Sequence, residues 1–484
     1  SKLDHDRMES GPGGTYGVYP LMSWTPDGKA IVFSSGGKLN SVELATGAVR
    51  AIPFSAPVRR PIVDRLAFEV PLPVDGKVRT RVHRWIQPTD QGVLSEALGD
   101  IHLGSGGQVT NLTRSRAFES SPAYDPATKT VYYASWSDDS LGSVWSLPLA
   151  GTRRVPARLT TVAASYGGLT LSADGKTLAY LRGAGDLNRG AALEQQSEFT
   201  LLVMGPDRTE REVTTLVWRP SNPLAVRVAP AIRFNPAGDR LLVNELERDT
   251  LFLREIRLDG QGKRTLFAFP HGARAVVSPD LRWIALREYF RTYLVPMNDA
   301  GKMLTVSGFD RQGTAIRVDR DDGEYVDWSP DSKELFWSRG AMLHQKSLAD
   351  ILASRPGSRA TDVSFEYQVA VPSGVVALTN ARVITMDGTR QVLDNATIVV
   401  RNNRIEQVGV GVAAPAGARV FDLRGKTVMP GIVDAHGHYN PDAATLGVIE
   451  QEHVGLLANL AYGTTTVYEV YGNHVKDFQV ADLQ

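Results

Sequence analysis

A turn followed by an alternating apolar and polar run recurs along most of the chain, and this repeat limits the fold more than any other feature. The copies lie between about Gly14 and Leu348, and each adds a second short strand pattern after the first. Equivalent apolar positions are separated by 61, 39, 47, 63, 43 and 51 residues, and they are Trp24, Trp85, Tyr124, Leu171, Phe234, Val277 and Trp328. Periods of this length, with several short strands per unit, are typical of a β-propeller with four-stranded blades.

The repeat predicts a propeller over residues 1–350. Seven blades follow if every copy forms one, and six follow if the weak copy at Trp85 is an elaboration of its neighbour. The repeated aromatic side chains are predicted to pack in blade cores rather than to bind a ligand. Residues 351–374 contain Pro356, Gly357, Pro372 and Gly374 and read as a linker, in which the alternating run VSFEYQVAV could pair with an exposed sheet edge.

The stretch MPGIVDAHGHYN, from Met429 to Asn440, carries the clearest chemical signal. Ile432 and Val433 favour an extended strand after the Pro-Gly turn. Residues two apart in a strand share a face, so His436 and His438 can direct two imidazoles at one metal ion. The alternative is a pair of ordinary surface histidines, and the flanking sequence decides between the two.

This context resembles the amidohydrolase superfamily, whose first barrel strand carries a Pro-Gly-x-x-Asp-x-His-x-His motif. The motif is matched at Pro430, Gly431, Asp434, His436 and His438. Upstream, VVALTNARVITMDG, ATIVVRNNRIEQVG and VFDLRGKTVMPG resemble the small β-sandwich segment of that family, and downstream LANLAYGTTTVYEV resembles the first barrel helix and second strand. The resemblance implies a β-sandwich segment at 375–428 and the start of a (β/α)8 barrel at 429–484.

The same resemblance implies one or two divalent metal ions, with zinc expected, and makes His436 and His438 metal ligands. Asp434 is an outer-shell candidate, with a strand-end cap as the alternative. Only 56 residues run from Met429 to the end, whereas a complete barrel needs about 200 or more. We therefore expect an incomplete barrel, with the catalytic residues and remaining ligands beyond Gln484. The candidates left in the chain are His453, His474 and Glu469, which lie within the first two barrel units and do not correspond to the family's later ligands. For His453 a packing or hydrogen-bonding role is expected.

The turns of the repeat resemble the SPDGK turns of TolB-like propellers, at Thr25 to Lys29, Ala173 to Lys176, Ser278 to Asp280 and Ser329 to Lys333. Proline suits such turns because it fixes φ, and Gly suits them because it accepts positive φ. Asp and Asn suit them because their side chains hydrogen-bond the local backbone. That resemblance implies a periplasmic or exported protein, with a cytoplasmic location as the alternative.

Composition excludes several classes of protein. Lys plus Arg and Asp plus Glu both number 53, so no global charge favours nucleic acid. Without cysteine, any transition metal must be held by His, carboxylate or a modified side chain. No apolar run approaches a membrane span, and no G-x-S-x-G elbow supports a serine peptidase. The acidic run at 319–324 reads as a solvated turn rather than a calcium loop.

Two functions follow as hypotheses. The first is a metal-dependent hydrolase of amide or related C–N bonds, with a small-molecule or peptide-like substrate and a propeller that gates access or recruits substrate or a protein partner. The second is a propeller-based binding protein whose C-terminal part is a non-catalytic remnant.

Overall fold

The computed structural model describes residues 22–35, 38–59, 76–150, 154–183, 197–220, 229–298, 300–438, 453–470 and 474–483. The chain divides into two compact units, Ser1–Leu72 and Pro73–Gln484. Both units are built mainly from β-strands, and the described residues form only three helices. None of these helices is long and apolar enough to span a lipid bilayer.

The first unit contains one antiparallel sheet. Its strands, in spatial order, are β1 (Ser23–Trp24), β2 (Ala30–Ser35), β3 (Lys38–Glu43) and β4 (Val49–Ile52). Asp27 holds the predicted turn, because its Oδ1 accepts hydrogen bonds from Thr25 Oγ1 at 2.6 Å and from the Lys29 N–H at 3.1 Å. Trp24 is 62% exposed, so the prediction of blade-core packing is wrong at this position. A unit with a single described sheet has no second sheet within it against which to bury that side chain.

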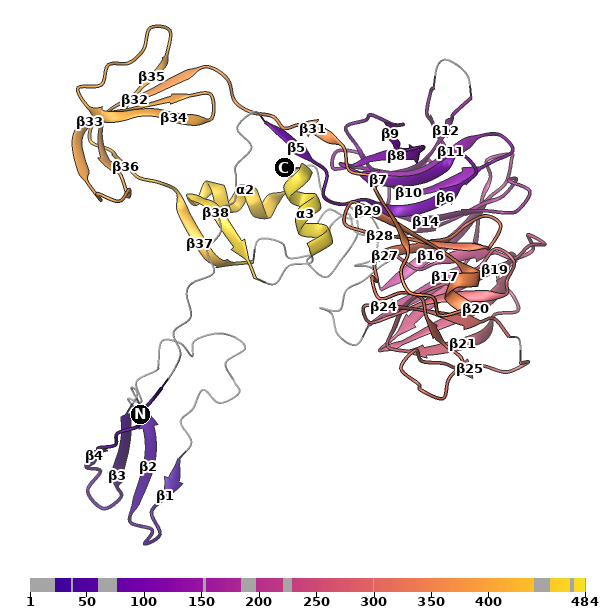
Figure 1. Ribbon diagram of the computed structural model, residues 1–484, viewed down its shortest axis with the longest axis horizontal. Helices are drawn as coiled ribbons and strands as arrows, with labels where there is room; N and C mark the ends of the chain where they lie inside the picture. Colours follow the sequence, from indigo (N-terminus) through magenta and orange to yellow (C-terminus); the bar gives the residue numbers. More distant parts are fainter. Residues whose placement is uncertain are drawn as a thin grey trace. The chain divides into compact units, whose positions relative to one another are not determined.

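Six further copies of the repeat build the larger part of the second unit as four-stranded sheets (Figure 1). The first two consist of β6 (Arg84–Thr89), β7 (Gly92–Ala97), β8 (Asp100–Ser105) and β9 (Gln108–Asn111), and of β10 (Phe118–Asp125), β11 (Thr130–Ser137), β12 (Leu141–Pro148) and β13 (Ala157–Arg158). The next two consist of β14 (Tyr166–Leu171), β15 (Leu178–Arg182), β16 (Glu198–Met204) and β17 (Glu210–Arg219), and of β18 (Ile232–Phe234), β19 (Arg240–Glu247), β20 (Thr250–Arg257) and β21 (Arg264–Pro270). The last two consist of β22 (Gly272–Val277), β23 (Trp283–Glu288), β24 (Arg291–Pro296) and β26 (Ile316–Arg317), and of β27 (Glu324–Trp328), β28 (Glu334–Arg339), β29 (Met342–Ser347) and β30 (Arg359–Asp362).

The first strands of these sheets contact one another in a closed order. Contacts run from β6 to β10, β14, β18, β22 and β27, and β27 in turn contacts β6. A short parallel pairing of β17 with β19 joins the third and fourth sheets, and β25 (Leu304–Thr305) extends the fourth by pairing with β21. The copy at Trp85 forms a complete sheet, so it is not an elaboration of its neighbour. The ring contains six sheets because the copy at Trp24 belongs to the first unit.

The repeated apolar positions of the ring pack as predicted where the sheets meet. Tyr124, Phe234, Val277 and Trp328 are all buried. The polar turns also form as predicted, since the hydroxyl of Ser329 donates to Asp331 at 2.7 Å and the Asp331 carboxylate accepts the Lys333 N–H at 3.2 Å. Side-chain packing between sheets and local hydrogen bonds within turns therefore explain the repeat.

A two-stranded ladder joins the two ends of the ring. The strand β5 (Lys77–Arg79) runs into the first sheet, and β31 (Glu366–Gln368) follows the sixth. They pair antiparallel, with Tyr367 opposite Val78. Residues 351–374 thus contribute β30 to the sixth sheet and β31 to this ladder, after the short helix α1 (Leu348–Leu352). The alternating run pairs with a strand that precedes the ring rather than with a sheet edge.

The segment that follows is a five-stranded sheet. It comprises β32 (Val375–Ile384), β33 (Val392–Arg401), β34 (Arg404–Val410), β35 (Arg419–Asp422) and β36 (Thr427–Val428). β32 pairs antiparallel with β33 and parallel with β35 and β36. Its small core contains Ala381, Val383, Ala396 and Ile398.

The C-terminal part of the described chain is a strand–helix–strand unit followed by a helix. It comprises β37 (Ile432–Gly437), α2 (Val454–Ala461), β38 (Thr464–Glu469) and α3 (His474–Leu483). β37 and β38 pair parallel, as expected for consecutive barrel strands, and the described residues contain no closed barrel. The helix α3 packs on the ring, with Val475 against Val82, Ile86 and Tyr325 and with Val480 against Phe118 and Trp136.

Candidate functional site

The strand β37 approaches β38 closely because Gly437, its last residue, and Gly431, the residue just before it, carry no side chain. A Cβ at Gly431 would overlap the side chain of Thr465, and a Cβ at Gly437 would overlap Cγ1 of Val467. Gly431 and Gly437 therefore permit a close parallel pairing that larger residues would block. This pairing sets the position of the histidine residues at the end of β37.

The structure brings His436 and His438 together on β37 and just past its end. Their ring centroids lie 5.3 Å apart, with an angle of 67° between the ring planes. Both side chains are exposed. The prediction that the two rings share one side of an extended segment is consistent with this short separation.

The ring spacing fits two nitrogen ligands of one metal ion. With zinc–nitrogen distances of about 2.0–2.1 Å, two imidazole centroids on adjacent corners of a tetrahedral site lie about 5 Å apart. Imidazole is also a suitable ligand for zinc. The described parts of the chain contain no group of three or more His, Asp or Glu residues arranged to hold a metal. His436 and His438 thus fit two ligand positions of a metal site, and its remaining ligands are not among the described residues.

Asp434 contacts the backbone of this segment. Its Oδ1 accepts a hydrogen bond from the N–H of His436 at 3.0 Å. This is the local, strand-end contact that the sequence offers as the alternative for Asp434. It fixes the backbone next to the first imidazole, and an outer-shell role toward a metal stays a prediction.

Glu469, at the end of β38, is a residue to which the sequence assigned no role in the site. It lies opposite Gly437 in the parallel register. Its Oε1 is 3.2 Å from Nδ1 of His438, and its side chain is only 6% exposed, compared with 54% for the histidine. The sequence contained one signal for this contact, namely that His438 and Glu469 both lie at the ends of predicted consecutive strands. Parallel neighbours place these ends at one edge of the sheet.

The other histidine candidates have different surroundings. His453 is buried and is the N-cap of α2, and its Nδ1 accepts a hydrogen bond from the Leu456 N–H at 3.2 Å. The prediction of a hydrogen-bonding role for His453 is confirmed. His474 begins α3, and its side chain lies outside the described residues.

The acidic run at 319–324 leads into β27, whose first residue is Glu324. Asp319 accepts a hydrogen bond from the buried Lys346 ammonium at 2.9 Å, and Asp321 pairs with Arg339 at 2.9 Å. The carboxylate of Asp322 accepts the Thr292 N–H at 2.9 Å. These carboxylates therefore serve contacts within and between the fifth and sixth sheets. The prediction of a solvated turn is wrong at Asp319, which is buried against Lys346.

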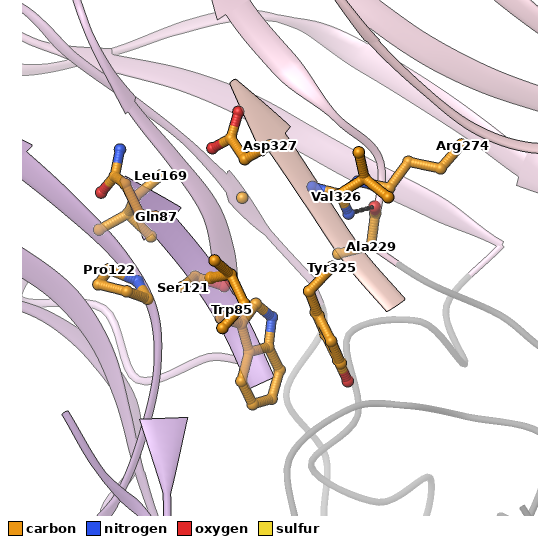
Figure 2. Close-up of a pocket in the computed structure, with 12 residues that line it drawn as sticks. Trp85, Gln87, Ser121, Pro122, Leu169, Ala229, Arg274, Tyr325, Val326 and Asp327 are labelled. Atoms are coloured by element: carbon orange, nitrogen blue, oxygen red, sulfur yellow. Dashed lines mark hydrogen bonds between the residues drawn. The ribbon is translucent and has the colours of Figure 1, made fainter. Parts of the chain in front are cut away.

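A cavity lies among the first strands of the ring (Figure 2). Its volume is about 70 Å³, and its lining includes Trp85, Gln87, Arg274, Tyr325 and Asp327. Arg274 donates a hydrogen bond to the carbonyl oxygen of Ala229 at 2.8 Å, as Figure 2 shows. Sites for drug-sized ligands have volumes of about 300–1,000 Å³, so this cavity suits a few water molecules better than a substrate.

Comparison with known proteins identifies short similar stretches. No protein-family model matches the chain. The chain is 49% identical over 51 residues to the dihydroorotase of Geobacter sulfurreducens, covering 10% of this chain and 11% of that protein. It is 41% identical over 51 residues to the imidazolonepropionase of Deinococcus radiodurans, covering 10% and 13% of the two chains. The human dihydropyrimidinase-related protein 5 is 29% identical over 92 residues, which is 19% of this chain and 16% of that protein.

Solved structures give a weaker likeness. TolB from Acinetobacter baumannii is 15% identical, with coverage of 68% of this chain and 76% of that chain and a TM-score of 0.38. Oligogalacturonate lyase in complex with manganese is 10% identical, with coverage of 67% and 87% and a TM-score of 0.37. TM-scores of this size are too low to carry an inference about fold or function. Local sequence similarity to enzymes is therefore the firmer of the two results.

Proposed function

We propose that the chain carries the first metal-ligand pair of a metal-dependent hydrolase of amide or related C–N bonds, preceded by a six-bladed β-propeller of TolB type. The observation that carries the proposal is the 5.3 Å separation of the rings of His436 and His438 at the end of a strand paired in parallel. Short similarities to dihydroorotase and imidazolonepropionase support the same class of enzyme. The closed order of six sheets supports the propeller.

His436 and His438 would hold one divalent metal ion, and zinc is the proposed metal. A bound ion of this kind lowers the pKa of a bound water and polarises a scissile carbonyl. Asp434 fixes the backbone at His436, and the close pairing of β37 with β38 holds the two histidines at one strand end. The contribution of these residues is therefore to bind and orient, and none of the described residues is assigned a step of proton transfer.

The role proposed for the propeller is to support the hydrolase part and to gate access or recruit a substrate or protein partner. The packing of α3 on the ring supports this role, because α3 directly follows the strand that ends in Glu469. The substrate is proposed to be a small amide or a peptide-like molecule. A periplasmic or exported location is part of the same proposal and rests on the resemblance of the SPDGK turns.

A second function is compatible with the same site. The described residues bring only two imidazoles to the site and no third ligand. A propeller-based binding protein with a non-catalytic remnant would show this arrangement as well. The two functions differ in whether metal binding at the histidines is accompanied by hydrolysis.

Equilibrium dialysis against zinc tests the proposal. The wild-type chain should retain zinc, and the His436→Ala/His438→Ala variant should lose it. His271→Asn is a matched control, because His271 is an exposed histidine of the ring that stacks on Tyr289. Equal zinc retention in the wild type and the double variant would contradict the metal site. Zinc-dependent hydrolysis of an amide panel supports the hydrolase, whereas zinc binding without hydrolysis supports the binding protein.

A further inference from the structure

We propose that Glu469 is a positioning residue that fixes the tautomer and orientation of His438. This inference deepens the proposed function and rests on it, since it assigns how one of the two ligands is prepared for a metal. The carboxylate would hold a proton on Nδ1 of His438, so that Nε2 presents its lone pair to the ion. Glu469 then acts through His438 and not on the substrate.

The geometry of the pair carries the proposal. Oε1 of Glu469 lies 3.2 Å from Nδ1 of His438, which is hydrogen-bonding distance for an imidazole N–H and a carboxylate. An ionised carboxylate only accepts hydrogen bonds, so the nitrogen that faces it must carry the proton. In the neutral imidazole the other nitrogen, Nε2, then carries the lone pair that can bind a metal.

Burial explains why the carboxylate can fix the ring. The side chain of Glu469 is 6% exposed, and that of His438 is 54% exposed. The Glu469 carboxylate is therefore enclosed by protein, while the imidazole of His438 keeps one side open to solvent. Carboxylate partners of this kind commonly orient metal-binding histidines and tune their basicity.

The strand register fixes the carboxylate in place. Gly437 pairs with Glu469 across the parallel strands, and the bare backbone of Gly437 faces Val467 closely. Glu469 is thus carried by a paired strand rather than by a loop, which limits how far the carboxylate can move from His438. His436 is held in a different way, through its backbone N–H and Asp434.

Long-range proton–nitrogen NMR of the metal-free chain, labelled with ¹⁵N-histidine and kept at alkaline pH, reads the tautomer directly. His438 should be found as the Nδ1–H form, with its signals assigned by their loss in His438→Gln. Glu469→Ala should move His438 toward the Nε2–H form. Glu469→Gln keeps the size of the side chain and should give an intermediate ratio, because its amide oxygen still accepts a hydrogen bond. Glu406→Ala, which removes an exposed partner of Arg401 in the five-stranded sheet, should change nothing at His438.

A zinc titration on the same signals separates this inference from the proposed function. Glu469→Ala should weaken zinc binding by about 10–100-fold while its circular dichroism stays that of the wild type. A wild-type chain with His438 in the Nε2–H form, or a tautomer unchanged by Glu469→Ala, would overturn the role of Glu469 even if zinc binds. A wild-type chain with the Nδ1–H form and no zinc-dependent change at His436 and His438 would instead contradict the proposed function.

Discussion

Asp482 of α3 accepts two hydrogen bonds from Arg81, a residue 401 positions earlier in the chain. The backbone N–H of Arg81 lies 2.9 Å from one carboxylate oxygen, and its Nε lies 2.6 Å from the other. Asp482 is nearly fully buried, and the Arg81 guanidinium is partly exposed. The last described helix is thereby joined to the segment that leads into the first sheet of the ring.

Replacing Asp482 by Ala should loosen α3 from the ring. Two charge-assisted hydrogen bonds are lost, and the exposure of Arg81 reduces the cost to about 1–2 kcal/mol. Hydrogen exchange should show faster exchange in α3 with little change in the fourth sheet of the ring. Asp394→Ala, which removes an exposed partner of Arg382, is the control. Uniformly faster exchange across the ring would contradict a local link.

Removing the carboxylate of Glu96 should destabilise the ring strongly. Glu96 and Arg84 form a fully buried ion pair at 2.9 Å, and Glu96 also accepts the Gly99 N–H at 2.7 Å and a hydrogen bond from Gln479 of α3. Loss of one partner leaves a buried charge, at a cost of about 3–5 kcal/mol. Urea denaturation of Glu96→Ala measures this loss. If the free energy of unfolding decreases by less than about 1 kcal/mol, as for an exposed ion pair, the prediction is contradicted.

Acid should weaken the closure of the ring through His83. Burial, with a smaller contribution from His102, lowers the pKa of His83 from 6.5 to about 3, and Asp362 opposes the shift. Phe365 packs on both histidines, and the His83 ring also contacts the hydroxyls of Ser95 and Thr80. Because the unfolded chain binds the proton more readily, the stability contributed by neutral His83 is present above pH 6.5 and is lost as pH falls toward about 3.

Between pH 6.5 and about 3, each unit of acidification lowers the contribution of His83 to the free energy of unfolding by up to about 1.4 kcal/mol. The free energy of unfolding of His83→Gln should therefore fall less steeply with acid than that of the wild type. Parallel curves for the two proteins would show that His83 does not titrate in the unfolding transition.

The contribution of Glu119 to stability should depend on pH in the opposite direction to that of His83. Burial raises its pKa to about 7, against hydrogen bonds from side chains that include Ser115. The folded state then binds a proton more tightly than the unfolded state, so this contribution to stability is present below pH 4.5 and is lost as pH rises toward 7. Glu119→Gln keeps the shape and removes the titration, so its stability relative to the wild type should increase as pH rises through this range. A pH-independent difference would contradict the prediction.

Gly437→Ala should separate β37 from β38. The added methyl group would overlap Cγ1 of Val467, and overpacking of this kind costs about 1–3 kcal/mol. The contact between His438 and Glu469 should weaken with it, which NMR of the His438 ring can follow. Adding Val467→Ala makes room for the methyl group, so the double variant should recover the wild-type signals. Failure of the second change to restore them would exclude this steric cause.

Local patterns predicted the elements of this fold well. The turn at Ser329, the buried Trp328 and the strand that begins at Ile432 follow from residues close in sequence, because turn chemistry and alternation act within a few positions. The proximity of the rings of His436 and His438 was also predicted locally, since the two residues are two positions apart. Their roles toward a metal stay predictions.

Contacts between distant residues were not predictable in the same way. The pairing of β5 with β31 and the bonds of Asp482 to Arg81 depend on how the ring closes, which no local pattern encodes. The contact of Glu469 with His438 was not predicted for the same reason, since it depends on the register between β37 and β38. The exposure of Trp24 depends on which sheets share a unit, and the repeat gives the same signal in both units.

X-ray absorption at the zinc edge tests the central claim most directly. The zinc-loaded wild-type chain should show scattering from imidazole rings with zinc–nitrogen distances of about 2.0–2.1 Å. The His436→Ala/His438→Ala variant should lose this scattering, whereas His271→Asn should keep it. An imidazole signal that is unchanged in the double variant would contradict the assignment of a metal site to the end of β37.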